Sequence, residues 1–152
     1  MASEGFERFF RRSRSDEAAR PAPLSGGLAA EVDARRDWVW SSVSADTPLN
    51  RNDDRTALSV IVALLGEVRA DETWKLQSLG IVFGDVLARV TGAEWVQVDD
   101  ERGTDAALRF GGPDDLAFPM TMLSKRVEAG EEVNVLDLFR SVATAIGEAQ
   151  AR

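Results

Sequence analysis

The hydrophobic period of the chain changes within residues 79–103, LGIVFGDVLARVTGAEWVQVDDERG, and this change is the strongest constraint on the fold. Up to Gly92 the apolar residues recur at intervals of three and four, which predicts a helix over residues 73–91 with a left-handed cap at Gly92. Beyond it, residues 94–99 and 106–110 alternate between apolar and polar positions, which predicts two strands joined by the turn DERGT. The chain therefore combines helices with an antiparallel hairpin.

The remaining segments extend this pattern. Residues 28–43 have helical spacing, and residues 55–68, RTALSVIVALLGEV, predict a largely buried helix. LAF at 116–118 predicts a short third strand, whereas residues 119–129 are compatible with a strand or a helix. Asn134 is a good N-cap for a closing helix of about 14 residues. We expect an α+β fold, with helices packed on a small antiparallel sheet of about three strands and a closing C-terminal helix.

Two small motifs have both a packing interpretation and a ligand-binding interpretation. Gly80 and Gly84 lie four apart in the predicted helix 73–91. Glycine is unfavourable inside a helix, so the pair indicates that another backbone passes close by. The alternative is that a ligand approaches the backbone at these two glycines, where no side chain covers it. Trp38 and Trp40 are interpreted as packing residues rather than as a ligand platform.

Missing residue types exclude several reaction classes. The 152-residue chain contains no cysteine, histidine or tyrosine. Disulfides, thiolate zinc sites and the serine–histidine and cysteine–histidine catalytic arrangements are therefore excluded within this chain. The groups that remain available for catalysis or binding are carboxylates, two lysines, sixteen arginines and hydroxyl groups. We expect no cofactor, and the composition favours a protein without enzymatic activity.

The net charge of −8 argues against a nucleic-acid partner, since phosphate neutralisation requires a basic face. The longest apolar run is too short to span a bilayer, and no secretory signal is recognised at the N-terminus. We expect a cytoplasmic protein with a single globular domain over residues 28–152.

Residues 1–27 differ from the rest and are expected to form a flexible arm and linker. The first 20 residues carry five arginines and four acidic residues, a net of +1, which leaves −9 for the other 132. Phe6, Phe9 and Phe10 are spaced to share one side of a short helix flanked by arginines. One interpretation is a membrane-binding or partner-docking arm. The simpler interpretation is a terminus that at most docks its phenylalanines on its own domain.

Four strings in order resemble a bacterial family called domain of unknown function 3806. They are LQSLGIVFGDVL, GAEWVQVDDERGTDAAL, FPM and SKRVEAGEEVNVLDLF, and the resemblance covers roughly residues 55–140. The resemblance implies no established activity, so no site residue can be transferred from it. Residues 1–54 lie mostly outside it.

Two charged clusters are candidate sites. Asp99, Asp100, Glu101 and Asp105 fall within seven positions and offer oxygen ligands for magnesium or calcium, although a hairpin turn also displays solvated acids. The second cluster, Arg109, Lys125 and Arg126, offers cations for an anion or an acidic partner. The simpler interpretation of this cluster is that Arg109 lies on the solvent side of a strand and that Lys125 and Arg126 lie near a helix end.

These observations favour a non-enzymatic module that binds another protein, as an adaptor or as an inhibitor of an effector. It would use an uncovered sheet face or an acidic surface. One alternative is a hydrolase that depends on a divalent metal at the acidic turn. The other is a peripheral membrane protein attached through Phe6, Phe9 and Phe10. The oligomeric state and the partner's identity are not encoded in these patterns.

Overall fold

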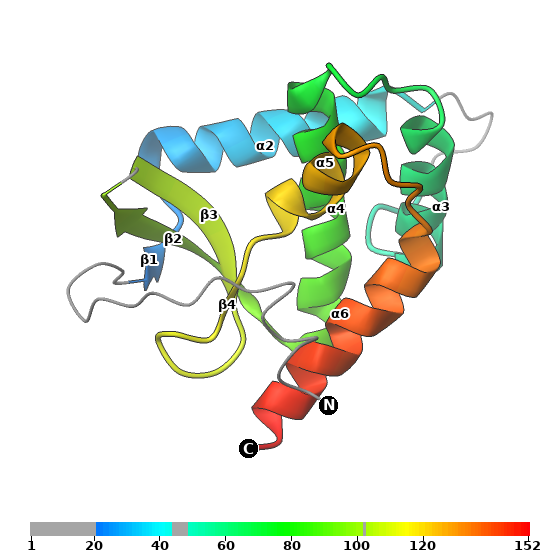
Figure 1. The fold of residues 1–152 in the computed structure, drawn as a ribbon. Helices are drawn as coiled ribbons and strands as arrows, with labels where there is room; N and C mark the ends of the chain where they lie inside the picture. Colours follow the sequence, from blue (N-terminus) through cyan, green and yellow to red (C-terminus); the bar gives the residue numbers. More distant parts are fainter. Residues whose placement is uncertain (1–20, 44–48, 102) are drawn as a thin grey trace.

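The computed structural model of the protein describes residues 21–43, 49–101 and 103–152. Along these residues the elements are β1 (Pro21–Pro23), α2 (Gly26–Ser41), α3 (Asp54–Leu65), α4 (Thr73–Thr91), β2 (Glu94–Asp100), β3 (Gly103–Arg109), β4 (Leu116–Ala117), α5 (Pro119–Glu128) and α6 (Val135–Gln150). The helices gather beside a small antiparallel sheet (Figure 1). The fold is α+β with a closing C-terminal helix, as predicted.

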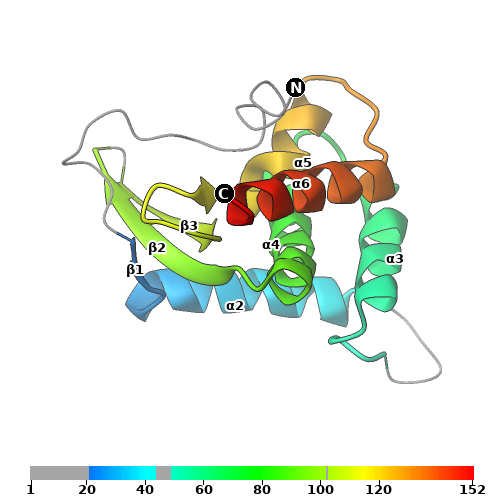
Figure 2. The ribbon, with the colours of Figure 1, turned by 90° about the horizontal axis from the view of Figure 1, so that it is seen from below.

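Helix α4 is the centre of the molecule. It contacts α2, α3, α5 and α6, and it is surrounded by other elements in both views (Figures 1 and 2). Leu79, Phe83 and Leu87 on this helix are completely buried, and each side chain of this size contributes about 1.5–3 kcal/mol when removed from water. The Phe83 ring meets Phe139 of α6 edge to face at 5.7 Å. The helix ends at Gly92, whose φ of +79° is the left-handed cap that the sequence predicted.

The two glycines of α4 provide room for close packing, as predicted. A Cβ atom on Gly80 would lie 2.5 Å from the carbonyl oxygen of Pro119, at the start of α5. A Cβ atom on Gly84 would lie 2.5 Å from the indole ring of Trp95. Backbone and ring thus occupy the space that side chains would need, which holds α5 and β2 directly against α4.

The sheet has the order β1-β2-β3-β4, with every neighbouring pair antiparallel. It has four strands rather than the expected three. The additional strand is β1, which falls inside the segment interpreted as a flexible linker. Its Pro21 pairs with Val98 at the edge of the sheet, where a residue without an N–H group is tolerated. Ser25 also donates its backbone N–H to Gln97 Oε1 at 3.0 Å, which fixes the entry into α2.

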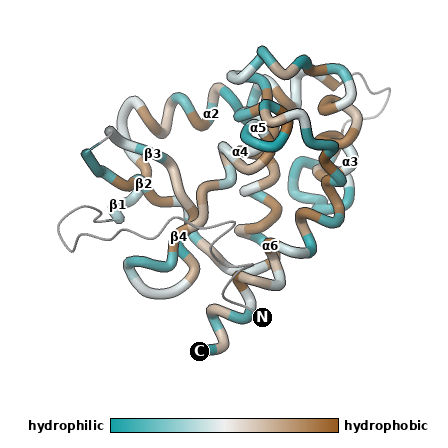
Figure 3. Tube along the Cα trace, viewed as in Figure 1, coloured by the Kyte–Doolittle hydropathy of each residue, from teal (hydrophilic) through white to brown (hydrophobic). Residues whose placement is uncertain are grey.

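Residues 119–129, which the sequence left open between strand and helix, form helix α5 (Pro119–Glu128). Pro119 occupies its first turn, where the missing N–H removes no helical hydrogen bond. Proline would instead interrupt a strand inside a sheet, so it explains the helical outcome. Figure 3 shows apolar residues concentrated on α3 and α4, while the C-terminal end of α5 is hydrophilic.

The two faces of the sheet have different neighbours. Ala106 packs with Val32 of α2 and Ile81 of α4, together with the partly buried Trp95. Side chains alternate along a strand, so the adjacent positions point to the opposite face. Four of them form a separate apolar cluster, which we call the second face of the sheet: Val96, Val98, Ala107 and Leu116. Helix α2 lies on the first face (Figure 2).

Candidate functional site

The acidic turn does not gather its carboxylates around one point. Asp99 pairs with Thr104 and Val98 pairs with Asp105, so the side chains of Asp99 and Asp105 point to opposite faces of the hairpin. Asp99 accepts a hydrogen bond from the hydroxyl of Thr104. Asp100 ends β2 and Glu101 follows in the turn. Within residues 21–43, 49–101 and 103–152, no three acidic side chains are placed to hold a metal ion.

The predicted basic cluster is distributed over two elements. Arg109, at the end of β3, donates to Glu94 Oε2 at 3.3 Å across the hairpin. Lys125 and Arg126 lie in the last turn of α5, where cations complement the helix dipole. Arg126 Nη1 also donates to the carbonyl of Met122 at 3.0 Å. These contacts agree with the simpler interpretation, and anion or partner binding by the three residues stays a prediction.

Trp38 and Trp40, the alternative ligand platform, lie in different surroundings. Trp40 is 8% exposed and belongs to the main core. Trp38 meets Trp74 edge to face at 6.0 Å, so both tryptophans serve helix packing. Phe6, Phe9 and Phe10 lie outside the described residues.

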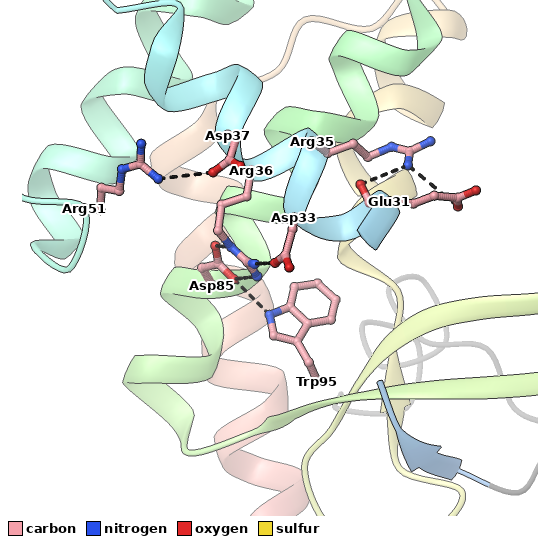
Figure 4. A network of polar contacts seen from close by, with 8 residues as sticks. All are labelled: Glu31, Asp33, Arg35, Arg36, Asp37, Arg51, Asp85 and Trp95. Atoms are coloured by element: carbon pink, nitrogen blue, oxygen red, sulfur yellow. Dashed lines mark hydrogen bonds and ion pairs between the residues drawn. The ribbon is translucent and has the colours of Figure 1, made fainter. Parts of the chain in front are cut away.

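A polar network that sequence reasoning missed is centred on Asp85 of α4 (Figure 4). Asp85 accepts hydrogen bonds from Arg36 Nε at 2.7 Å and Arg36 Nη2 at 2.9 Å, which form a bidentate pair. It also accepts from Trp95 Nε1 at 2.9 Å. The hydrogen bond to Asp85 is the main cause that raises the pKa of Arg36 above its ordinary value. The Arg36 guanidinium therefore stays charged, and the hydrogen bonds to Asp85 tie α2, α4 and β2 together.

The same network borders a hollow of about 380 Å³. Its lining residues are Arg36, Trp40, Arg51, Asn52, Asp85, Ala88, Arg89 and Trp95. Each of the three arginines already has a carboxylate partner. Arg36 pairs with Asp33 and Asp85, Arg51 with Asp37, and Arg89 with Asp54. Four carboxylates thus pair with three guanidinium groups, so the described lining residues leave no unpaired cation for an anion, and the network is structural.

One signal for this network is present in the sequence. Asp85 is the only acidic residue of α4, and Val82, Phe83, Gly84, Val86 and Leu87 around it are buried. A lone carboxylate within an apolar helical stretch requires a partner, because an unpaired buried charge is costly. The partner itself lies 49 positions away and carries no periodic signal.

A larger concave surface lies where three helix ends meet, and we call it the α3–α6 groove. It encloses about 760 Å³, and its lining residues are Val62, Leu65, Gly66, Val127, Glu131, Glu132, Val133, Asn134, Val135 and Leu136. They come from the end of α3, the end of α5, the connecting segment and the start of α6. Asn134 is engaged as the N-cap of α6, where its side chain accepts from Asp137 N at 3.1 Å.

The groove is apolar with an acidic border. Val62 is 50% exposed and Leu136 is 46% exposed, which is high for side chains of this kind. Glu131 and Glu132 are exposed beside them, and none of the lining residues in the described part of the chain is a lysine or an arginine. This surface can receive apolar side chains and pair with positive charges.

None of the helices in the described parts of the chain is long and apolar enough to cross a membrane.

Comparisons with known proteins support the family resemblance and the fold. A family model described as Domain of unknown function (DUF3806) matches residues 57–139, which is more than half of the chain. No curated protein sequence matches the chain. A crystal structure of a protein from Bacteroides thetaiotaomicron VPI-5482, at 1.50 Å resolution, is similar with a TM-score of 0.67 and 20% identity. The similarity covers 87% of this chain and 50% of that protein, so the chain spans half its length. At this identity the similarity concerns the fold alone.

Proposed function

Because the chain belongs to the DUF3806 family, whose description names no activity, we propose its function from its surface: a non-enzymatic module that binds another protein. The proposed docking site is the α3–α6 groove, and the module would act as an adaptor or as an inhibitor of an effector. We place it in the cytoplasm, since a chain without cysteine suits a reducing compartment.

The observation that carries the proposal is the pair Val62 and Leu136, two half-exposed apolar side chains within a concave surface. Single exposed apolar residues are common on proteins and need no explanation. Here, however, they adjoin Leu65, Val127 and Val133, so a partner would cover a continuous apolar surface rather than one side chain. Interfaces commonly have such an apolar centre surrounded by a polar rim.

The border of the groove indicates the chemistry of the partner. Glu131 and Glu132 supply two negative charges, and the whole chain carries a net charge of −8. A segment with apolar side chains next to lysine or arginine would gain contacts in the groove and would be steered toward it electrostatically. We therefore propose a partner segment of basic and apolar character.

Selection of peptides from a random library on the full chain tests the proposal. The selected peptides should combine apolar and basic residues and should shift the NMR methyl signals of the groove. Val62→Asp and Leu136→Asp should each weaken binding roughly tenfold or more, because each places a charge where an apolar contact forms. Val90→Asp is the matched control, since Val90 is 52% exposed on α4 outside the groove.

Charge reversal tests the contribution of the acidic border of the groove separately from that of its apolar residues. Glu131→Lys combined with Glu132→Lys should lower the association rate and its dependence on salt. Glu148→Lys, an exposed position on α6 outside the groove, should have little effect. Selected peptides that bind all of these variants as well as they bind the unaltered chain would contradict the groove as the docking site.

A further inference from the structure

The described residues that line the α3–α6 groove come from helices and one short connection (Figure 1). Val62, Leu65 and Gly66 are spaced at i, i+3 and i+4, so they share one side at the end of α3. Val133 and Leu136 lie on either side of the N-cap of α6. None of the described lining residues belongs to a strand. A partner therefore meets helix surfaces here, rather than a sheet edge to which it would add a strand.

The connection between α5 and α6 gives an extended partner little to pair with. Glu131 donates its backbone N–H to the carbonyl of Arg126 at 3.0 Å, and the carbonyl of Asn134 accepts from the first turn of α6 at 2.9 Å. Glu132 and Val133 stand between these two engaged positions, whereas a strand usually has about three to ten residues. An extended segment would therefore gain few backbone hydrogen bonds in the groove.

The three helix ends at the groove differ in how their charges are complemented. Asn134 caps the positive end of α6, and Lys125 and Arg126 complement the negative end of α5. The last turn of α3, all of which lies within the described residues, contains no lysine or arginine. The carbonyl groups of that turn and the carboxylates of Glu131 and Glu132 therefore favour a positive charge from a partner.

We propose that the segment bound in the groove is an amphipathic helix with lysine or arginine beside its apolar face. This inference rests on the proposed function, because it specifies the form of the segment that the groove binds. Apolar residues at i, i+3, i+4 and i+7 of that helix contact Val62 and Leu136, and its basic side chains complement the acidic border and the end of α3. Gly66 has no side chain, so the backbone of a second helix can approach α3 there.

Two peptides of identical composition test the helical form on the full chain. Each has about 18 residues, drawn from leucine, lysine, alanine and glutamine, a length at which an isolated helix becomes measurable. In the first peptide leucine recurs at i, i+3, i+4 and i+7, and in the second it alternates with the other residues, as in a strand. Calorimetric titration should show at least tenfold tighter binding of the first peptide, with NMR shifts of the Val62 and Leu136 methyl groups.

The outcomes separate the form of the segment from the location of the site. If both peptides shift the methyl groups of Val62 and Leu136 with equal affinity, or if the alternating peptide binds more tightly, the helical form is overturned and the groove stands as the docking site. If neither peptide shifts these signals, this proposal is overturned, and the selection from the random library decides the proposed function independently.

A proline in the middle of the first peptide provides a matched control. Proline breaks a helix but leaves the leucine and lysine content unchanged, so it should weaken binding at least tenfold. The carbon chemical shifts of the bound unsubstituted peptide should be helical. Undiminished binding of the proline peptide, or extended chemical shifts in the bound state, would contradict the helical form.

Ala63, an exposed residue in the last turn of α3, tests the basic contact. Ala63→Lys gives α3 a cation of its own and should weaken binding of the first peptide about two- to fivefold. Ala63→Gln adds a polar side chain without charge and should leave the affinity unchanged. Thermal unfolding of both variants checks that the fold is retained. Equal affinities of the two variants would overturn the placement of a basic side chain at the end of α3.

Discussion

Asp85 illustrates how a single residue can connect elements that are distant in sequence. Its carboxylate accepts hydrogen bonds from Arg36 on α2 and from the indole N–H of Trp95 on β2, and its side chain is only 16% exposed. A buried ion pair adds little stability compared with apolar packing, but removal of one partner leaves the other without compensation. The network therefore affects stability mainly when one of its members is removed.

We expect Asp85→Ala to lower the free energy of unfolding by about 2–3 kcal/mol. The Arg36 guanidinium would keep only Asp33, and the Trp95 N–H would lose its acceptor. Urea unfolding followed by tryptophan fluorescence measures the change. Asp37→Ala removes an exposed carboxylate 3.4 Å from Arg51 and should change stability by less than about 0.5 kcal/mol. Equal losses in the two variants would contradict the role assigned to Asp85.

Asp53 at the start of α3 gives a pH-dependent prediction. The hydroxyl of Thr56 and then its backbone N–H donate hydrogen bonds that lower the pKa of Asp53. A carboxylate whose pKa is lower in the folded state contributes stability above its unfolded pKa, roughly pH 4, and loses that contribution as the pH falls through the folded value. The N-cap of α3 should therefore weaken in acid.

Substitution of Thr56 tests the cause. Thr56→Val removes the hydroxyl donor and should raise the pKa of Asp53 toward its ordinary value, whereas Thr56→Ser retains the donor and should leave it low. Titration of the Asp53 carboxyl carbon by NMR measures both. An unchanged pKa in the valine variant would show that the backbone N–H alone sets the value.

At the level of elements, the contacts of α4 depend on the absence of side chains at two positions. Alanine is favoured over glycine by about 1 kcal/mol inside a helix. At Gly80, however, the new methyl group would lie 2.5 Å from a backbone carbonyl oxygen of α5, which cannot move without shifting the helix. We expect Gly80→Ala to destabilise the protein by about 1–3 kcal/mol net, measured by chemical unfolding.

Gly147 in α6 is the matched control. A Cβ atom there meets no atom within 4 Å. Gly147→Ala should therefore stabilise the protein by about 0.5–1 kcal/mol through helix propensity alone. Opposite signs for the two substitutions are the expected result, and two stabilising substitutions would show that α4 and α5 are not in close contact.

The same elements show how far sequence reasoning extends. Helix α4 was predicted with its bounds because its apolar period is long and Gly92 marks its end. Strand β1 was missed because two prolines resemble a linker, and its strand conformation depends on the free edge of β2. Helix α5 stayed ambiguous because ten residues are too short for a clear period. The Asp85 network and the α3–α6 groove were not predicted, since each is assembled from segments that come together only in the folded chain.

At the level of the whole molecule, negative charge is abundant but dispersed. The chain carries 26 acidic residues, and the best acidic cluster in its sequence is divided by the pleat of a hairpin. Because side chains alternate along a strand, Asp99 and Asp105 point to opposite faces. Acidic residues that are close in the sequence therefore do not meet at one point. A divalent cation requires several oxygen ligands around one point. The long-range field of such a surface would steer a basic partner of the kind proposed above.

We therefore expect magnesium or calcium at millimolar concentration to leave the midpoint of thermal unfolding unchanged beyond the effect of ionic strength. A ligand that binds only the folded state raises the midpoint progressively as its concentration exceeds the dissociation constant. Differential scanning fluorimetry against sodium chloride at matched ionic strength separates specific binding from screening. A saturable increase that disappears in the Asp99→Asn and Asp105→Asn double variant would restore the metal site at the acidic turn, and with it the metal-dependent hydrolase. An unchanged midpoint would leave binding through the apolar groove as the activity to pursue.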